Sequence, residues 1–232
     1  MSRDTIVGNA WQHVMLLSSL PALPHFARAK TLPISAERLR SRLGMLAQDD
    51  AETLESAWEF VRWRRGASAV ADAELVAAYE RLDDSPRGRL IRECVRLRLE
   101  TVTVLAALRR RRDGEAAAPA TPWGIGQFVA TIARRWSHPD FGLAHRMPWL
   151  PRARALLEQD EYLALEELLL TIAWEQLDGI DQRYTYTLQN VIVYLLKWEI
   201  LERWLSMNPA RAAARFDALL EQVLHDELAA IV

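Results

Sequence analysis

The chain has 232 residues, of which 50% are hydrophobic and 26% charged, a mixture typical of a globular protein that can bury a core without disulfides. Its net charge of −2 gives no reason to expect nucleic-acid binding, and its single cysteine, Cys94, excludes a disulfide framework within the chain and favours a reducing compartment. The N-terminus makes a poor signal peptide and no stretch approaches the ~20 apolar residues of a membrane span, so we expect a cytoplasmic protein, peripheral at the inner membrane at most.

Helical patterns follow one another along almost the whole chain, and no alternating strand pattern competes with them convincingly. Only residues 11–21, "WQHVMLLSSLP", are compatible with either a helix or a strand. The expected helix starts, marked by capping residues or by acids in the first turn, are Ser35, Asp49, Ser85 with Pro86, and Asn208 with Pro209. The pattern predicts an all-α fold with long central helices.

The clearest break in these patterns is residues 114–123, which are small, contain proline and have no large apolar side chain before Trp123. We expect this stretch to link two helical units, residues 1–113 and residues 124–232. A second irregular stretch, residues 137–151, holds three prolines and two histidines, and its aromatic content predicts a packed loop.

The two predicted units differ in charge. Residues 1–113 carry 19 basic against 15 acidic side chains, whereas residues 114–232 carry 10 against 16. Two faces with different partners would explain this difference, and so would two halves that attract each other, which is the more ordinary explanation.

The segment 188–204, "LQNVIVYLLKWEILERW", is apolar almost all round and yet carries four charges. On a helical wheel Glu199, Glu202 and Arg203 fall within about 100° of one another, and Lys197 lies on the opposite side. Glu199 and Arg203 are four residues apart with the acid first, the favourable order for an ion pair. We expect a central helix with neighbours on two sides and a mainly structural Glu199–Arg203 pair. The alternative is that these charges grip a partner.

This helix also resembles a recurring helix of the C-type (also called d-type) subunit of V/A-type ATPases. The residues that carry the resemblance are Val191, Tyr194, Leu195, Leu196, Glu199, Arg203 and Leu205. The long helix of the first half resembles the other long helix of that family, with Glu100, Leu108, Arg109 and Gly114 in the corresponding places. The opening "MLLSSLPAL" and the tail helices look like a shorter group of uncharacterised bacterial proteins encoded beside V/A-type ATPase genes. The chain is shorter than a typical C-type subunit and has room for about two of its three helical units.

The resemblance implies a shortened helical funnel that links the central stalk to the membrane rotor ring as a coupling or assembly subunit. Such a role needs protein partners, a stiff body and two contact faces, and it needs no cofactor. The alternative is a free-standing all-α adaptor that is unrelated to a rotary ATPase. The genes beside this one would discriminate between the two.

Catalytic motifs are sparse. "WGIGQF" is only a G-x-G and fits a helix start better than a phosphate loop, His138 and His145 lack metal-pair spacing, and no Glu-x-x-His occurs for a di-metal bundle. Cys94 among arginines could be reactive, but a buried thiol is the more ordinary expectation. We predict no enzyme activity, no metal and no cofactor. The candidate interaction residues are Arg109, Arg110, Arg111, Arg112 and Glu202, although a solvated helix end would also explain the arginines.

Overall fold

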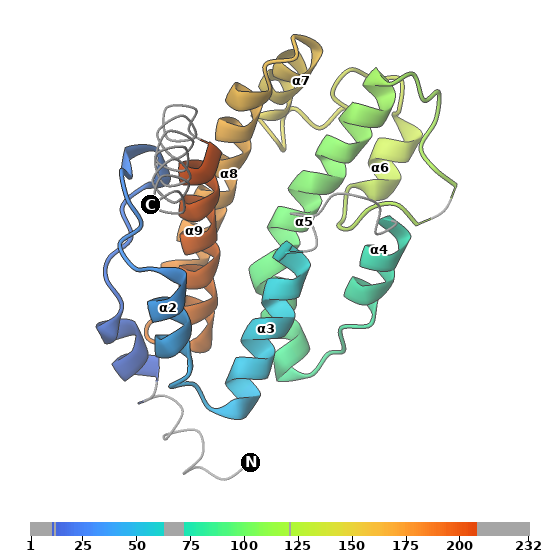
Figure 1. Cartoon of the computed structure of the whole chain (residues 1–232). Helices are drawn as coiled ribbons and strands as arrows, with labels where there is room; N and C mark the ends of the chain where they lie inside the picture. The colour runs from blue at the N-terminus through green and yellow to red at the C-terminus, as the bar shows by residue number, and fades with distance from the viewer. Residues whose placement is uncertain (1–10, 12, 63–71, 121, 208–232) are drawn as a thin grey trace, which may run out of the picture.

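The computed structural model describes residues 11, 13–62, 72–120 and 122–207. Within these ranges the chain is helical and contains no strand, which confirms the predicted all-α class (Figure 1). After a first helix over residues 13–19 come η1 (Phe26–Arg28), α2 (Ala36–Leu43), α3 (Gln48–Arg62), α4 (Asp72–Glu80), α5 (Pro86–Arg112), α6 (Val129–Arg134), α7 (Leu150–Glu158), α8 (Tyr162–Asp181) and α9 (Leu188–Met207). Within the stretch that fitted a helix or a strand, residues 13–19 are therefore helical. No helix in the described ranges is long and apolar enough to cross a membrane.

The helix starts follow the capping residues that the sequence indicates. The Ser35 hydroxyl accepts from the backbone N–H of Arg38 at the start of α2, and the Ser85 hydroxyl accepts from Gly88 at the start of α5. Pro86 occupies the first turn of α5, where its missing N–H removes no hydrogen bond. The helix start expected at Asn208 and Pro209 lies outside the described residues.

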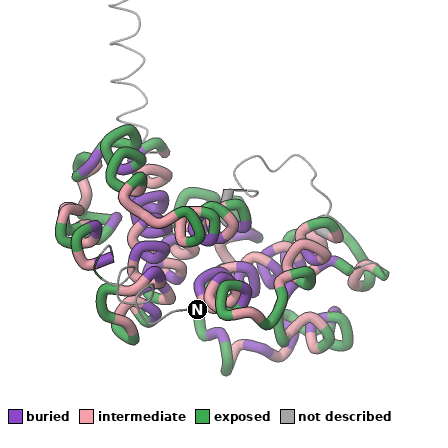
Figure 2. Tube along the Cα trace, turned by 90° about the horizontal axis from the view of Figure 1, so that it is seen from below, coloured by how far each residue is buried: buried purple, intermediate pink, exposed green. Residues whose placement is uncertain are grey.

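The buried side chains form two hydrophobic cores, which we call the first and the second core (Figure 2). The first core joins α2, α3, α4 and the first half of α5 to the second half of α8 and to α9, and includes Leu54, Phe60, Val95, Leu177 and Val191. The second core joins the second half of α5 to residues 123–157 and the first half of α8, and includes Leu105, Ile132, Phe141, Leu150 and Leu157. Both α5 and α8 therefore pass through the two cores.

The cores do not divide at the predicted linker. Val95 and Val191 lie on opposite sides of residues 114–123 and share the first core, while the second core begins at Val104, within α5. The division of the chain into units at this linker stays a prediction. Among the described residues, the boundary between the two cores lies within α5 and α8.

The loop that follows the linker is fixed to α5 by close backbone contact. The Thr103 hydroxyl accepts from Ile125 N (2.9 Å), and the buried Glu100 carboxylate accepts from Gln127 N (3.3 Å). Gly124 and Gly126 lie against Thr103 and Glu100 with no room for a side chain, and Gly126 has a φ of +109°. The two glycines of "WGIGQF" thus permit close packing on α5, and α6 begins shortly afterwards at Val129.

The second irregular stretch is a packed loop, as its composition predicts. Phe141, Leu143 and Met147 are all buried in the second core. The His138 ring accepts from the backbone N–H groups of Asp140 and Gly142, so this histidine organises the turn that carries Phe141.

Candidate functional site

The α9 helix is the most deeply buried element of the described chain. Its side chains are buried on almost every side, because it packs against α8, α3, α5 and η1. This agrees with the expectation of a central helix that has neighbours on two sides. The charged side chains of α9 therefore need partners on these neighbouring helices.

Glu199 is 4% exposed and accepts a hydrogen bond from the indole Nε1–H of Trp58 on α3. The carboxylate is therefore held by a helix that lies 141 residues away in the sequence. Since a buried acceptor without a donor is costly, this bond stabilises the packing of α3 against α9.

Arg203 lies one turn further along α9 and has a different partner. Its Nε donates to Glu166 Oε1 on α8 at 2.5 Å, and both side chains are partly buried. The structure thus gives Glu199 and Arg203 partners on two different helices, α3 and α8. The direct pairing of Glu199 with Arg203 stays a prediction, as does the role of Glu202, which lies partly buried on the same helix.

Lys197, on the opposite side of α9, is bound by the preceding helix. Its Nζ lies 2.6 Å from Asp178 and 3.4 Å from Asp181 on α8, and 5.6 Å from the centre of the Trp174 ring. Asn190 donates to Asp181 and accepts from Thr187 at the turn between the two helices. The second polar line of α9 therefore fixes the α8–α9 hairpin.

Three of the four arginines at the end of α5 bind the chain itself. Arg111 donates to the carbonyls of His138 (2.5 Å) and Pro139 (2.6 Å), and Arg112 donates to the Leu157 carbonyl (3.2 Å). Arg110 lies 3.9 Å from Glu115. Arg109 is exposed and has no such contact with a described residue, so it is the member of this group most available to a partner.

We expect Arg111→Ala to lower the free energy of unfolding by about 1–2 kcal/mol, because it removes two hydrogen bonds and a cation–π contact with Phe141. Arg109→Ala carries the same charge change on the same helix and should change stability by less than about 0.5 kcal/mol. Urea denaturation monitored by circular dichroism measures both. Equal losses in the two variants would show that the loop contacts of Arg111 do not stabilise the fold.

Cys94 is a buried thiol in the first core, 3% exposed. Burial, and after it the nearby Glu93, raise the pKa of the Cys94 thiol to about 12, and Arg183 opposes the shift only in part. We expect the native protein to resist Ellman's reagent at pH 8, because the reactive thiolate is scarce and covered. Full reaction in denaturant is the positive control, and fast reaction of the native protein would contradict the burial.

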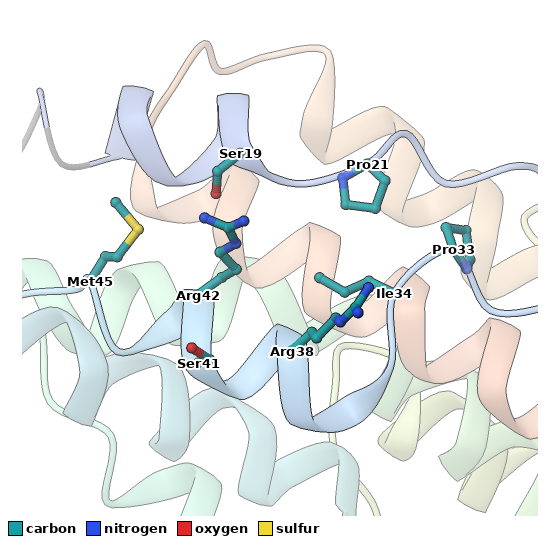
Figure 3. Close-up of a pocket in the computed structure, with 8 residues that line it drawn as sticks. All are labelled: Ser19, Pro21, Pro33, Ile34, Arg38, Ser41, Arg42 and Met45. Carbon is teal, nitrogen blue, oxygen red and sulfur yellow. The ribbon is translucent and has the colours of Figure 1, made fainter.

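The described part of the chain also contains an open cavity of about 610 Å³, between the N-terminal segment and α2 (Figure 3). It is lined by Ser19, Pro21, Pro33, Ile34, Arg38, Ser41, Arg42 and Met45. Figure 3 shows the Arg42 side chain rising from α2 towards Ser19, and the Arg38 side chain lying beside Ile34. The cavity therefore combines two guanidinium groups with an apolar wall and contains no acidic lining residue.

The far wall of this cavity is fixed by α9. The Tyr194 hydroxyl donates to the Pro21 carbonyl and the Trp198 indole N–H donates to the Ile34 carbonyl, both at 2.9 Å. Burial raises the pKa of Tyr194 to about 12, so its hydroxyl remains a donor at physiological pH. Tyr194 is one of the residues that carry the resemblance to the C-type ATPase subunit, and here it positions a loop.

The remaining candidate residues do not gather into a metal centre. Among the described residues no group of three or more His, Cys, Asp or Glu side chains could hold a metal ion. His138 accepts a hydrogen bond from the Gly142 backbone N–H within its own loop. His13 lies 2.9 Å from Asp50 and connects the first helix to α3.

A comparison with protein families matches residues 33–227 to a family described as "Protein of unknown function (DUF2764)". The chain belongs to the DUF2764 family. Searches of the curated proteins and of the solved structures found no match. The DUF2764 description names no activity and no partner.

The region that matches the DUF2764 family begins among the residues that line the cavity. Pro33, Arg38 and Arg42 belong to the matched region, whereas Ser19 and Pro21 precede it. Sequence reasoning missed this cavity, because its walls are a loop and a short helix brought together by α9. The local signal that could have indicated it is α2 itself, which has three arginines and one acid in eight residues.

Proposed function

We propose that this protein is a non-catalytic coupling or assembly subunit of a bacterial V/A-type ATPase, linking the central stalk to the membrane rotor ring. The observation that carries the proposal is that the two helices resembling those of the C-type subunit, α5 and α9, are the ones around which the fold is built. The proposal rests on this resemblance and on the stiffness of these helices.

A subunit that passes torque between two partners must resist bending between its contact faces. The 27-residue α5 is roughly 40 Å long, and it runs through both cores without a break. The 20-residue α8 does the same, and the ion pairs of Lys197 and Arg203 fix α9 to it. Displacing one core would therefore require bending two packed helices.

Two exposed apolar pairs offer contact faces. Met15, on the first helix, is 60% exposed, and Trp11, which precedes residues 13–19 in the chain, is 66% exposed. Tyr162 and Leu163, at the start of α8, are 54% and 52% exposed. Figure 1 shows the first helix at the lower end of the molecule and the start of α8 at the upper end beside α7. If one partner bound at each pair, the force between the two partners would act along the long helices.

The test is a pull-down of purified central-stalk and membrane-ring subunits from the same organism, with the full chain as bait. We expect both to bind, Met15→Glu to weaken one and Leu163→Glu to weaken the other. Ala130→Glu, at an exposed position of α6, is the control for one added negative charge.

Two findings together would overturn the proposal. They are failure to bind either subunit and the absence of V/A-type ATPase genes beside this gene. The free-standing adaptor would then be the better description.

A further inference from the structure

The cavity beside α2 holds two positive charges that have no partner among the described residues. Lys197, Arg203 and Arg111 all bind described acids or carbonyls. The side chains of Arg38 and Arg42 make no hydrogen bond or ion pair with a described residue, although both line the cavity. They lie four residues apart on one helix, so both side chains project from the same face of α2 and line the same cavity (Figure 3).

The shape of the cavity is set before any ligand arrives. Tyr194 and Trp198 hold the carbonyls of Pro21 and Ile34 from α9, and Pro21 and Pro33 stiffen the wall. A preformed site loses little conformational entropy on binding, so its contacts contribute more fully to affinity.

The geometry points to a docking site for an acidic segment of a protein partner, one that places a carboxylate beside an apolar side chain. Guanidinium groups pair with carboxylates through two parallel hydrogen bonds, and Arg38 and Arg42 can each offer such a pair. Ile34 and Met45 provide apolar surface for the neighbouring side chain.

Two features favour a peptide over other anionic ligands. The cavity is open to solvent, whereas sites for small molecules usually enclose about 70–90% of the ligand. The arginines line a cavity together with Pro21 and Pro33, whereas a bilayer surface is flat. This inference does not depend on a rotary ATPase, and its test uses no ATPase component.

The experiment is selection from a random-peptide phage library on the immobilised full chain, followed by fluorescence anisotropy with the enriched peptides. We expect the wild type to enrich peptides with Asp or Glu next to a large apolar residue. Arg38→Gln with Arg42→Gln should weaken those peptides at least about tenfold, because charge-assisted hydrogen bonds are lost. Affinity should also fall with added salt.

The matched control is Arg40→Gln with Arg89→Gln, which removes the same charge from exposed positions outside the cavity. It should keep the wild-type affinity, and thermal denaturation should show that both double variants are folded. The inference is overturned if the wild type enriches no acidic peptide, or if the cavity variant binds as well as the control. Binding to phosphatidylglycerol vesicles that requires Arg38 and Arg42, without acidic peptides, would replace it with a membrane site.

Discussion

Glu199→Ala is expected to lower the free energy of unfolding by about 2–5 kcal/mol. The carboxylate is 4% exposed and accepts from Trp58, so its removal leaves a partly buried indole N–H without this acceptor at a cost of about 1–3 kcal/mol. The lost side-chain volume adds roughly 1–2 kcal/mol at a site that cannot collapse freely. Urea denaturation followed by far-ultraviolet circular dichroism measures the change.

Two further variants separate the hydrogen bond from the volume. Glu199→Gln keeps an oxygen that can accept from Trp58 and should lose less than half as much stability as Glu199→Ala. Trp58→Phe removes the donor, and in a double-mutant cycle with Glu199→Ala the losses should be clearly less than additive. Additive losses would show that the Trp58–Glu199 bond does not hold α3 to α9.

The same variants test the predicted Glu199–Arg203 pair. Because Arg203 contacts Glu166 on α8, we expect the losses of Glu199→Leu and Arg203→Met to add within about 0.5 kcal/mol. If the double variant recovers much of the stability lost by either single one, the two charges act as a pair. Binding of partners should survive in every folded variant, and selective loss of binding would assign these charges to an interface.

Gly126→Ala is expected to lower the free energy of unfolding by about 3 kcal/mol. Its φ of +109° is unfavourable for alanine, which costs roughly 1–2 kcal/mol, and the new Cβ would overlap the buried Glu100 side chain. Glu100 cannot move away freely, because it accepts from Arg96 and from the Gln127 backbone. Thermal and urea denaturation would report the loss.

Gly114→Ala is the matched control, because Gly114 also has a positive φ, +94°, with no atom near the added Cβ. It should lose only the backbone part, roughly 1–2 kcal/mol. Combining Gly126→Ala with Glu100→Ala removes the overlap. The stability lost by the double variant should therefore be smaller than the sum of the two single losses by more than about 1 kcal/mol. Equal losses at Gly126 and Gly114 would mean that the loop is not pressed against α5.

Local features of the fold could be predicted because their signals lie within a few residues. Ser35, Ser85 and Pro86 mark helix starts through contacts that span three or four positions, and the structure has helices at those places. The packed loop at residues 137–151 is likewise indicated by its own composition.

The partners of the charged residues could not be predicted, because they depend on contacts between distant segments. Trp58 is 141 residues from Glu199, and nothing in the local pattern of α9 points to α3. For the same reason a solvated helix end was the more ordinary explanation of the arginines at the end of α5, although Arg111 and Arg112 bind residues 27 and 45 positions away. The cavity depends on two such contacts, from Tyr194 and Trp198, and was missed altogether.

The arrangement of the two cores sets an order of events during synthesis. The second core is drawn from one continuous stretch, Val104 to Leu165, and can close as soon as that stretch has left the ribosome. The first core needs α9, whose last buried contribution is Leu201. After their own synthesis the apolar faces of α3 and of early α5 therefore remain uncovered for roughly 5–30 s of translation. The nascent chain therefore carries an unpaired apolar surface for most of its elongation, which is the kind of surface that chaperones bind.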